Sequence, residues 1–395
     1  MINRGQGILL IVSNIDAPNY EIIWPQPELV TTPLANPILG RMEAKFLKRA
    51  LKSGWIGANG IFTENCEEFL DVYFNSNSLL VSNGSVALIL ALRALGIGPG
   101  DEVLLPDLTY AATASSVLAV GATPKFCDVE LDSWNISVDE IRKKITSKTR
   151  AIIVVHLYGM PADLLSISSF ASKNGLFLIE DCAEAFGAEF HGKKVGTIGD
   201  IGTFSFFPNK LLTSGEGGAV ISKHAHLYEK MKMLRGQGMS FTHRYYFLEP
   251  GYNFRITELQ AAILWAQLKQ LRFLWEKRES SENFYRSNIG KTGLIPTAQY
   301  DFLRAPWIFT IRLSNFDFNM KVAVASKLAR LGIETRPAFY PLSNMPAFYQ
   351  VQNPRNANSE LISKEAISLP TGFHVSKKTY FEIFKIINKE VQKCR

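Results

Sequence analysis

Short apolar runs alternate with segments of helical period between residues 79 and 222. The run Arg150–Leu157, which contains Ala-Ile-Ile-Val-Val without a polar interruption, is typical of a strand buried on both faces. Such strands separated by helices predict a mostly parallel sheet with helices on both sides. The predicted strands are Leu79–Ser82, Glu102–Pro106, Pro124–Val129, Arg150–Leu157, Leu176–Asp181, Gly202–Phe207 and Gly218–Ser222, and the predicted helices between them are Val86–Leu95, Ala111–Val120 and Ala162–Asn174.

Helical patterns flank this region on both sides. Residues 41–53 and 62–75 predict two amphipathic helices before it, and residues 254–285 predict one long helix after it. Further α and β signals follow, which predict a smaller C-terminal α/β domain with strands at Trp307–Leu313 and Ile333–Phe339 and a helix at Lys321–Leu331. We therefore expect an N-terminal extension (1–33), a large domain (34–285) and a small domain (286–395).

Composition excludes several classes of protein. The chain has 395 residues, of which 47% are hydrophobic and 20% charged, as in a globular protein of two or three domains. Its net charge of +7 comes from scattered Lys and Arg without a basic block, which does not favour nucleic-acid binding. No apolar run reaches the roughly 18–20 residues that cross a bilayer. We expect no membrane or nucleic-acid partner and a cytoplasmic location.

The sulfur and imidazole side chains do not predict a metal site. The four cysteines, Cys66, Cys127, Cys182 and Cys394, are far apart, and the six histidines show no paired ligand spacing. Isolated reduced thiols are the simplest interpretation, and His156 at the end of its strand is read as a structural histidine.

The turn Ser82-Asn83-Gly84-Ser85 joins a predicted strand to a predicted helix. The first amides of a helix are unpaired and lie at the positive end of its dipole, so this turn could bind a phosphate. Gly84 allows a close approach, and Ser85 adds a hydroxyl. The alternative is an ordinary serine N-cap.

Two carboxylates follow another predicted strand. Asp181 stands at its end, where it could pair with a protonated pyridine nitrogen and keep that ring electron-withdrawing. Glu184 lies one turn further and could reach a ring substituent. The alternatives are that Asp181 caps a following helix and that Glu184 faces solvent.

Lys210 leaves the aromatic strand around Phe204 and enters the glycine-rich segment 213–218. A lysine that forms a Schiff base needs a lowered pKa, which apolar surroundings supply. Ser205 could bind a phosphate. A solvated surface lysine is the alternative for Lys210 taken alone.

Two further residues have open interpretations. Tyr110 comes just after a strand, where it could stack on a flat ring or belong to the core. Asn253, before the long helical segment, is either a cap or a polar contact to a ligand.

Taken in order, these segments resemble the DegT/StrS-type sugar aminotransferases, which have the pyridoxal 5′-phosphate (PLP) fold type I. The resemblance extends from about residue 54 to residue 370. It rests on SGWIG (53–57), SNGSVAL (82–88), PDLTYAAT (106–113), IEDCAEAFG (179–187), GTFSFFPNK (202–210), TSGEGG (213–218), GYNFRITELQAA (251–262) and RPAFYPL (336–342).

The resemblance implies a role for each candidate residue. By position, Lys210 matches the Schiff-base lysine and Asp181 the partner of the pyridine nitrogen. The cofactor-binding positions are matched by Gly84, Ser85 and Ser205 at the phosphate, Tyr110 on the ring, Glu184 near the ring hydroxyl, and Asn253, which reaches the phosphate of a neighbouring subunit's cofactor. The last match implies a homodimer with shared active sites.

The resemblance also implies a reaction. The sequence looks nearest to members that use glutamate to aminate the C4 ketone of a nucleotide-diphosphate-linked 4-keto-6-deoxysugar. Pro208 and Ser343 depart from the family's usual residues, a small residue and a histidine. The alternatives are an aminotransferase for an amino-cyclitol or another ketone, a PLP-dependent sugar dehydratase, which Lys210 argues against, and a non-catalytic regulatory protein.

Overall fold

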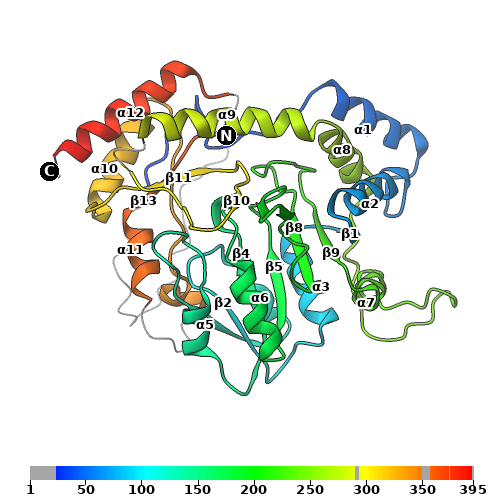
Figure 1. Ribbon diagram of the computed structural model, residues 1–395. Helices are drawn as coiled ribbons and strands as arrows, with labels where there is room; N and C mark the ends of the chain where they lie inside the picture. Colours follow the sequence, from blue (N-terminus) through cyan, green and yellow to red (C-terminus); the bar gives the residue numbers. More distant parts are fainter. Residues whose placement is uncertain (1–23, 290–292, 349–355, 373, 394–395) are drawn as a thin grey trace.

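The computed structural model describes residues 24–289, 293–348, 356–372 and 374–393. At its centre is a seven-stranded sheet in the order β1-β9-β8-β5-β4-β2-β3 (Figure 1). Five neighbouring strands, from β8 to β3, are parallel, whereas β9 is antiparallel to both of its neighbours. The strands are β1 (Asn77–Val81), β2 (Glu102–Pro106), β3 (Thr123–Cys127), β4 (Thr149–Val155), β5 (Phe177–Asp181), β8 (Ile201–Ser205) and β9 (Gly218–Ser222).

Helices cover both faces of this sheet, because its strands are apolar on both sides. On β4, Ile152 belongs to the core on one face and Ile153 to the core on the other. The first face is covered by α2 (Ile61–Phe74), α5 (Val138–Lys144), α6 (Leu164–Lys173) and α8 (Glu258–Lys269), and the second by α3 (Gly84–Ala94), α4 (Ala112–Ala119) and α7 (Ala225–Arg235). Helix α1 (Arg41–Ser53) packs on α8. The predicted mostly parallel sheet is thus confirmed.

A second, antiparallel sheet lies toward the C-terminus. It has the order β11-β13-β12, with a core that includes Tyr285 and Phe309. Its elements are β11 (Phe309–Arg312), α10 (Phe318–Ala329), β12 (Arg336–Pro337), α11 (Ala357–Glu365), β13 (Ala366–Leu369) and α12 (Lys377–Gln392). A small third sheet joins β6 (Glu189–Phe190), β7 (Lys193–Lys194) and β10 (Phe302–Leu303).

The predicted helix 254–285 is wrong in one respect, because two helices occupy it. Helix α8 ends before Gln270, and α9 (Leu271–Ile289) continues across residue 285 toward α12 (Figure 1). Gln270 donates a hydrogen bond from its amide to Glu43 of α1, at 2.8 Å. The periodicity of apolar residues could not predict this tertiary contact.

The described part of the N-terminal segment lies against the second sheet region. Trp24 donates from its indole nitrogen to the carbonyl of Thr335 at 2.9 Å, and Thr32 pairs with Ile333. Residues 1–23 of the expected extension, and Cys394, lie outside the described residues. Among the described helices none is both long and apolar enough to cross a membrane.

Glu258 connects the start of α8 to the start of α2. Its buried carboxylate accepts hydrogen bonds from the amides of Phe62 and Thr63, at 2.6 and 3.2 Å, and from the Thr63 hydroxyl. A negative charge at this end of α2 pairs with its free amides and its dipole.

We therefore expect Glu258→Ala to lower the free energy of unfolding by about 3 kcal/mol, because buried amides lose a charged acceptor. Urea denaturation of the cofactor-free protein measures this. Glu276→Gln, which removes the exposed pair with Arg272, is the control and should change it by less than ~0.5 kcal/mol. Equal effects of the two substitutions would contradict the assignment.

Candidate active site

The predicted phosphate-binding turn lies where α3 begins beside the end of β8. A Cβ built on Gly84 would come within 2.8 Å of the Ser205 Cβ, so only glycine permits this approach. The helix is capped by Asn83, whose side chain accepts from the amide of Val86 at 2.9 Å, so the alternative of a serine cap is wrong. Ser85, Ser205 and the first amides of α3 together form a cradle suited to an anion.

Asp181 ends β5 with its side chain buried. One carboxylate oxygen accepts from the Thr113 hydroxyl at 2.9 Å and the other from the Ala183 amide at 3.1 Å. Burial raises the pKa of Asp181, and these hydrogen bonds and the charge of Lys210 oppose the rise. Turns follow Asp181, so it does not cap a helix. In the part of the chain that the structure describes, no cation forms an ion pair with Asp181, and such a buried carboxylate is well suited to a protonated ring nitrogen.

Lys210 lies in the turn after β8 and lines the same cavity as Asp181. Its Nζ is 4.0 Å from the centre of the Trp307 ring. Burial lowers the pKa of Lys210, against the charges of Glu184 and Asp181, which favours a neutral, nucleophilic amine. The interpretation as a solvated surface lysine is therefore wrong.

The backbone around Lys210 is fixed by two other side chains. The Trp307 indole donates to the carbonyl of Asn209 at 3.0 Å. Arg278 of α9 donates to the carbonyls of Asn209 and Lys210, at 3.5 and 3.4 Å. These contacts hold the lysine's backbone while its side chain extends into the cavity.

Glu184 is buried, so the alternative that it faces solvent is wrong. It accepts from the amide of Tyr158 at 2.7 Å. Burial raises the pKa of Glu184 to about 7, although Lys210 opposes the rise. It can therefore act as a donor or an acceptor toward a ring hydroxyl near neutral pH.

Tyr110 is 63% exposed and lines the cavity, so the alternative of a core tyrosine is wrong. Its ring centre is 6.0 Å from that of Phe339, which in turn stacks on Tyr158 at 5.4 Å. An aromatic face is thus available for a flat ligand.

These side chains surround one cavity of about 530 Å³. Seven of the eight predicted residues line it: Gly84, Ser85, Tyr110, Asp181, Glu184, Ser205 and Lys210. Asn253 does not, since it is exposed and accepts from Arg255 through its side-chain oxygen at 3.1 Å.

Thr113, Trp307 and Arg336 are among the lining residues that the sequence did not predict. Thr113 lies within the segment PDLTYAAT, so its helical spacing after Tyr110 offered a signal. Arg336 opens the segment RPAFYPL, which offered a signal, whereas Trp307 comes from the region of the second sheet and no local pattern assigns it to the cavity.

Ser343, which stands where the family usually has a histidine, does not line the cavity. Its amide and its hydroxyl both donate to the buried carboxylate of Asp107, each at 2.7 Å, and Asn356 donates to the same group. Ser343 therefore ties the segment after β12 to the end of β2.

The cavity fits PLP in its chemistry. It presents an anion cradle, an aromatic face, a buried carboxylate and an amine of lowered pKa around one space. The close approach of Gly84 to Ser205 supports a phosphate site independently of the family resemblance, because a side chain at position 84 would fill the cradle.

The sequence matches a known family over most of its length. Residues 37–388 match the DegT/DnrJ/EryC1/StrS aminotransferase family. The GDP-perosamine synthase of Escherichia coli O157:H7 is 40% identical over 90% of this chain and 98% of its own, and that of Caulobacter vibrioides is 38% identical over 86% and 92%.

Solved structures give the same fold. The PLP-form of a putative sugar aminotransferase from Streptococcus pneumoniae superposes with a TM-score of 0.85, covering 91% of this chain and 98% of that one at 24% identity. The predicted α/β fold of PLP fold type I is thereby confirmed. The chain belongs to the DegT/DnrJ/EryC1/StrS family of aminotransferases, and its cofactor is pyridoxal 5′-phosphate.

Proposed function

We propose that this aminotransferase transfers an amino group from glutamate to a nucleotide-linked keto-sugar, with a 4-keto-6-deoxyhexose as the acceptor. The observation that carries the proposal is the position of Lys210 in one cavity with Asp181. Support for the acceptor comes from the relatives named GDP-perosamine synthase, which align along most of the chain.

Each residue has a part in this proposal. The cofactor, when bound, supplies an aldehyde for amines and a ring that withdraws electrons. The start of α3 and Ser205 hold its phosphate, Tyr110 covers its ring, and Asp181 holds the proton on the ring nitrogen. Glu184 contacts the ring hydroxyl.

Lys210 is the acid–base group. Its neutral Nζ takes the proton from the α-carbon of glutamate, and in the second half-reaction it delivers a proton to the sugar carbon that receives nitrogen. Burial favours this role, since it lowers the pKa of the amine and so favours its neutral form.

We expect borohydride reduction of the holoenzyme to attach a pyridoxyl group to Lys210 alone, as peptide mass spectrometry will show. Lys210→Ala should lower turnover by at least about 10³-fold, because it removes the acid–base group. Lys193→Ala, at an exposed lysine of β7, is the control and should retain turnover. A label elsewhere, or an active Lys210→Ala variant, would refute the assignment.

The acceptor is tested with a panel of GDP-, UDP- and dTDP-linked keto-sugars, each with glutamate or glutamine as donor. We expect glutamate with a GDP-linked 4-keto-6-deoxysugar to give a product in which an amino group and a hydrogen replace the carbonyl oxygen, as mass spectrometry detects. Amination of a cyclitol ketone in its place would contradict the proposed acceptor and leave the role of Lys210 intact.

We also propose that the protein is a cytoplasmic homodimer with shared active sites. The loop after α7 projects from the body of the molecule (Figure 1). It exposes apolar side chains, among them Phe241, Tyr245, Phe247 and Leu248, and an exposed cluster of this kind is suited to an interface. Asn253 follows this loop and would reach the cofactor phosphate of the partner. Three buried free thiols, of Cys66, Cys127 and Cys182, are in keeping with a reducing compartment.

Asn253→Ala should raise the Kd for PLP by roughly 10-fold, because a hydrogen bond to a charged group is lost. Equilibrium dialysis measures this, with Asn283→Ala on the exposed face of α9 as the control.

Mixing subunits separates a shared site from an internal one. After exchange between Lys210→Ala and Asn253→Ala subunits, a mixed dimer would place an intact Lys210 opposite an intact Asn253. Borohydride labelling at low PLP should therefore recover in the mixture. Labelling no greater than in Asn253→Ala alone would place Asn253 within its own subunit's site, or outside both sites.

A further inference from the structure

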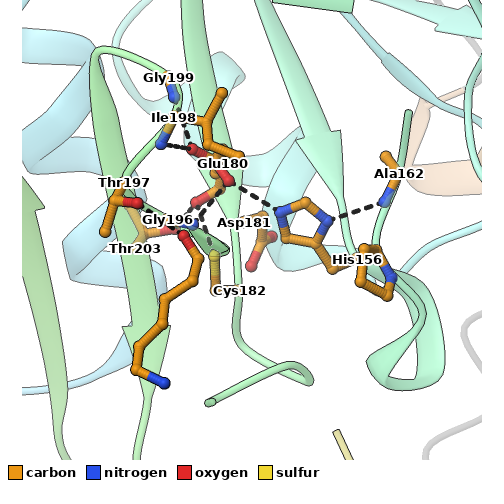
Figure 2. Close-up of polar contacts among 12 residues, drawn as sticks. His156, Ala162, Glu180, Asp181, Cys182, Gly196, Thr197, Ile198, Gly199 and Thr203 are labelled. Carbon is orange, nitrogen blue, oxygen red and sulfur yellow. Dashed lines mark hydrogen bonds and ion pairs between the residues drawn. The ribbon is translucent and has the colours of Figure 1, made fainter. Parts of the chain in front are cut away.

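A fully buried pair, His156 and Glu180, lies beside the strand end that carries Asp181 (Figure 2). His156 follows β4, and Glu180 precedes Asp181 on β5. Successive residues of a strand point to opposite faces of the sheet, so Glu180 points away from the face that Asp181 presents to the cavity. Neither His156 nor Glu180 lines the cavity.

All lone pairs of the Glu180 carboxylate are engaged. One oxygen accepts from the amides of Ile198 and Gly199, at 2.8 and 2.6 Å, and the other from the amide of Gly196 at 2.6 Å and from His156 Nε2 at 3.1 Å (Figure 2). Burial alone would raise the pKa of Glu180, but the hydrogen bonds and the imidazole outweigh burial and lower it. Glu180 is therefore an anion held in a single orientation.

His156 connects this anion to Asp181. Its Nδ1 accepts from the amide of Ala162 at 3.0 Å, which assigns the ring proton to Nε2 and makes that nitrogen the donor to Glu180. Its own backbone amide donates to the carbonyl of Asp181 at 3.1 Å. His156 thus binds two consecutive residues of β5, one through its ring and one through its backbone.

A metal site is the competing interpretation, because His156, Glu180 and Cys182 place donor atoms within 4.8 Å of one another. The hydrogen bonds argue against it. Each Glu180 oxygen already accepts two N–H groups, and His156 has one nitrogen accepting and the other donating. A cation would have to displace these bonds.

We propose that His156 and Glu180 are positioning residues that aim the Asp181 carboxylate at the ring nitrogen of PLP. Among the described residues, only the Thr113 hydroxyl and the Ala183 amide bind the side chain of Asp181, so its direction depends on where the strand end lies. Glu180 fixes that end against the loop 196–199, and His156 fixes it against β4. An apolar pair at these two positions would cost less to bury than the Glu180 anion. The stability of the protein therefore gives no reason for a charge here.

This inference rests on the role of Asp181 in the proposed function, and its test isolates the contact between Asp181 and the ring nitrogen. The probes are PLP and its 1-deaza analogue, in which carbon replaces that nitrogen. The ratio of their dissociation constants for the full-length apoprotein reports the contact and requires no turnover. A general loss of packing would weaken both ligands and leave the ratio unchanged.

Three variants separate the two residues' effects. In His156→Asn the side chain is too short to reach Glu180, whereas in His156→Gln the amide can still donate to it. Glu180→Gln turns an amide nitrogen toward backbone N–H groups. We expect the preference for PLP to fall at least about tenfold in His156→Asn and Glu180→Gln, because small displacements of a reacting group have large effects. His156→Gln should restore it to within about threefold of the original.

Two controls complete the experiment. Cys182→Ala alters the same buried cluster, where the thiol has only a weak contact at 3.7 Å to the carbonyl of Glu180, and should lower Tm without changing the ratio. Asp181→Asn should abolish the preference. If it does not, the proposed role of Asp181 fails. If it does, but His156→Asn and Glu180→Gln retain the original ratio, only the positioning role is overturned. Should Glu180→Gln not fold, the comparison of His156→Asn with His156→Gln decides.

Discussion

Enclosure of one half-buried amine with two buried carboxylates in a single cavity is the constraint on which the site depends. Lys210, Asp181 and Glu184 share a cavity. Burial raises the pKa of both carboxyl groups and lowers that of the amine, which favours the neutral form of each, while the opposite charges resist these shifts. Parallel strands make this possible, because their carboxyl ends deliver side chains from separate parts of the chain to one edge. Burial thereby favours the neutral, nucleophilic form of the amine.

Much of this arrangement could be predicted from the sequence. Strand β2 agrees with its predicted bounds, and β5 with its predicted end, because the apolar runs at residues 103–106 and 176–179 mark buried strands. Most of the predicted residues follow strand ends, and the carboxyl ends of parallel strands lie at one edge of the sheet. A parallel sheet therefore predicted that these residues would lie together. Their individual roles came only from the resemblance to a family, because an isolated Asp or Lys after a strand has several common explanations.

What the sequence did not predict depends on contacts between distant segments. Helices α7 and α12 and strand β13 were not predicted, and the strand expected at Ile333–Phe339 is confined to Arg336–Pro337. Pro337 and Pro341 cannot donate to a ladder, which limits that strand. Trp307 contacts Lys210 across almost one hundred residues of chain, so no periodicity could assign it to the site.

The two sides of the cavity have different origins, and this bears on what each side recognises. The large sheet supplies the cradle at Gly84, the carboxylate of Asp181 and Lys210, all of which line the cavity. The opposite wall, with Arg336 and Phe339, comes from the chain around the second sheet. If the cofactor binds the first side, as the proposed function has it, discrimination among acceptor sugars arises largely on the second. Ser343 donates two hydrogen bonds to Asp107 and does not line the cavity. It therefore affects the second side of the cavity only through the backbone of its own segment.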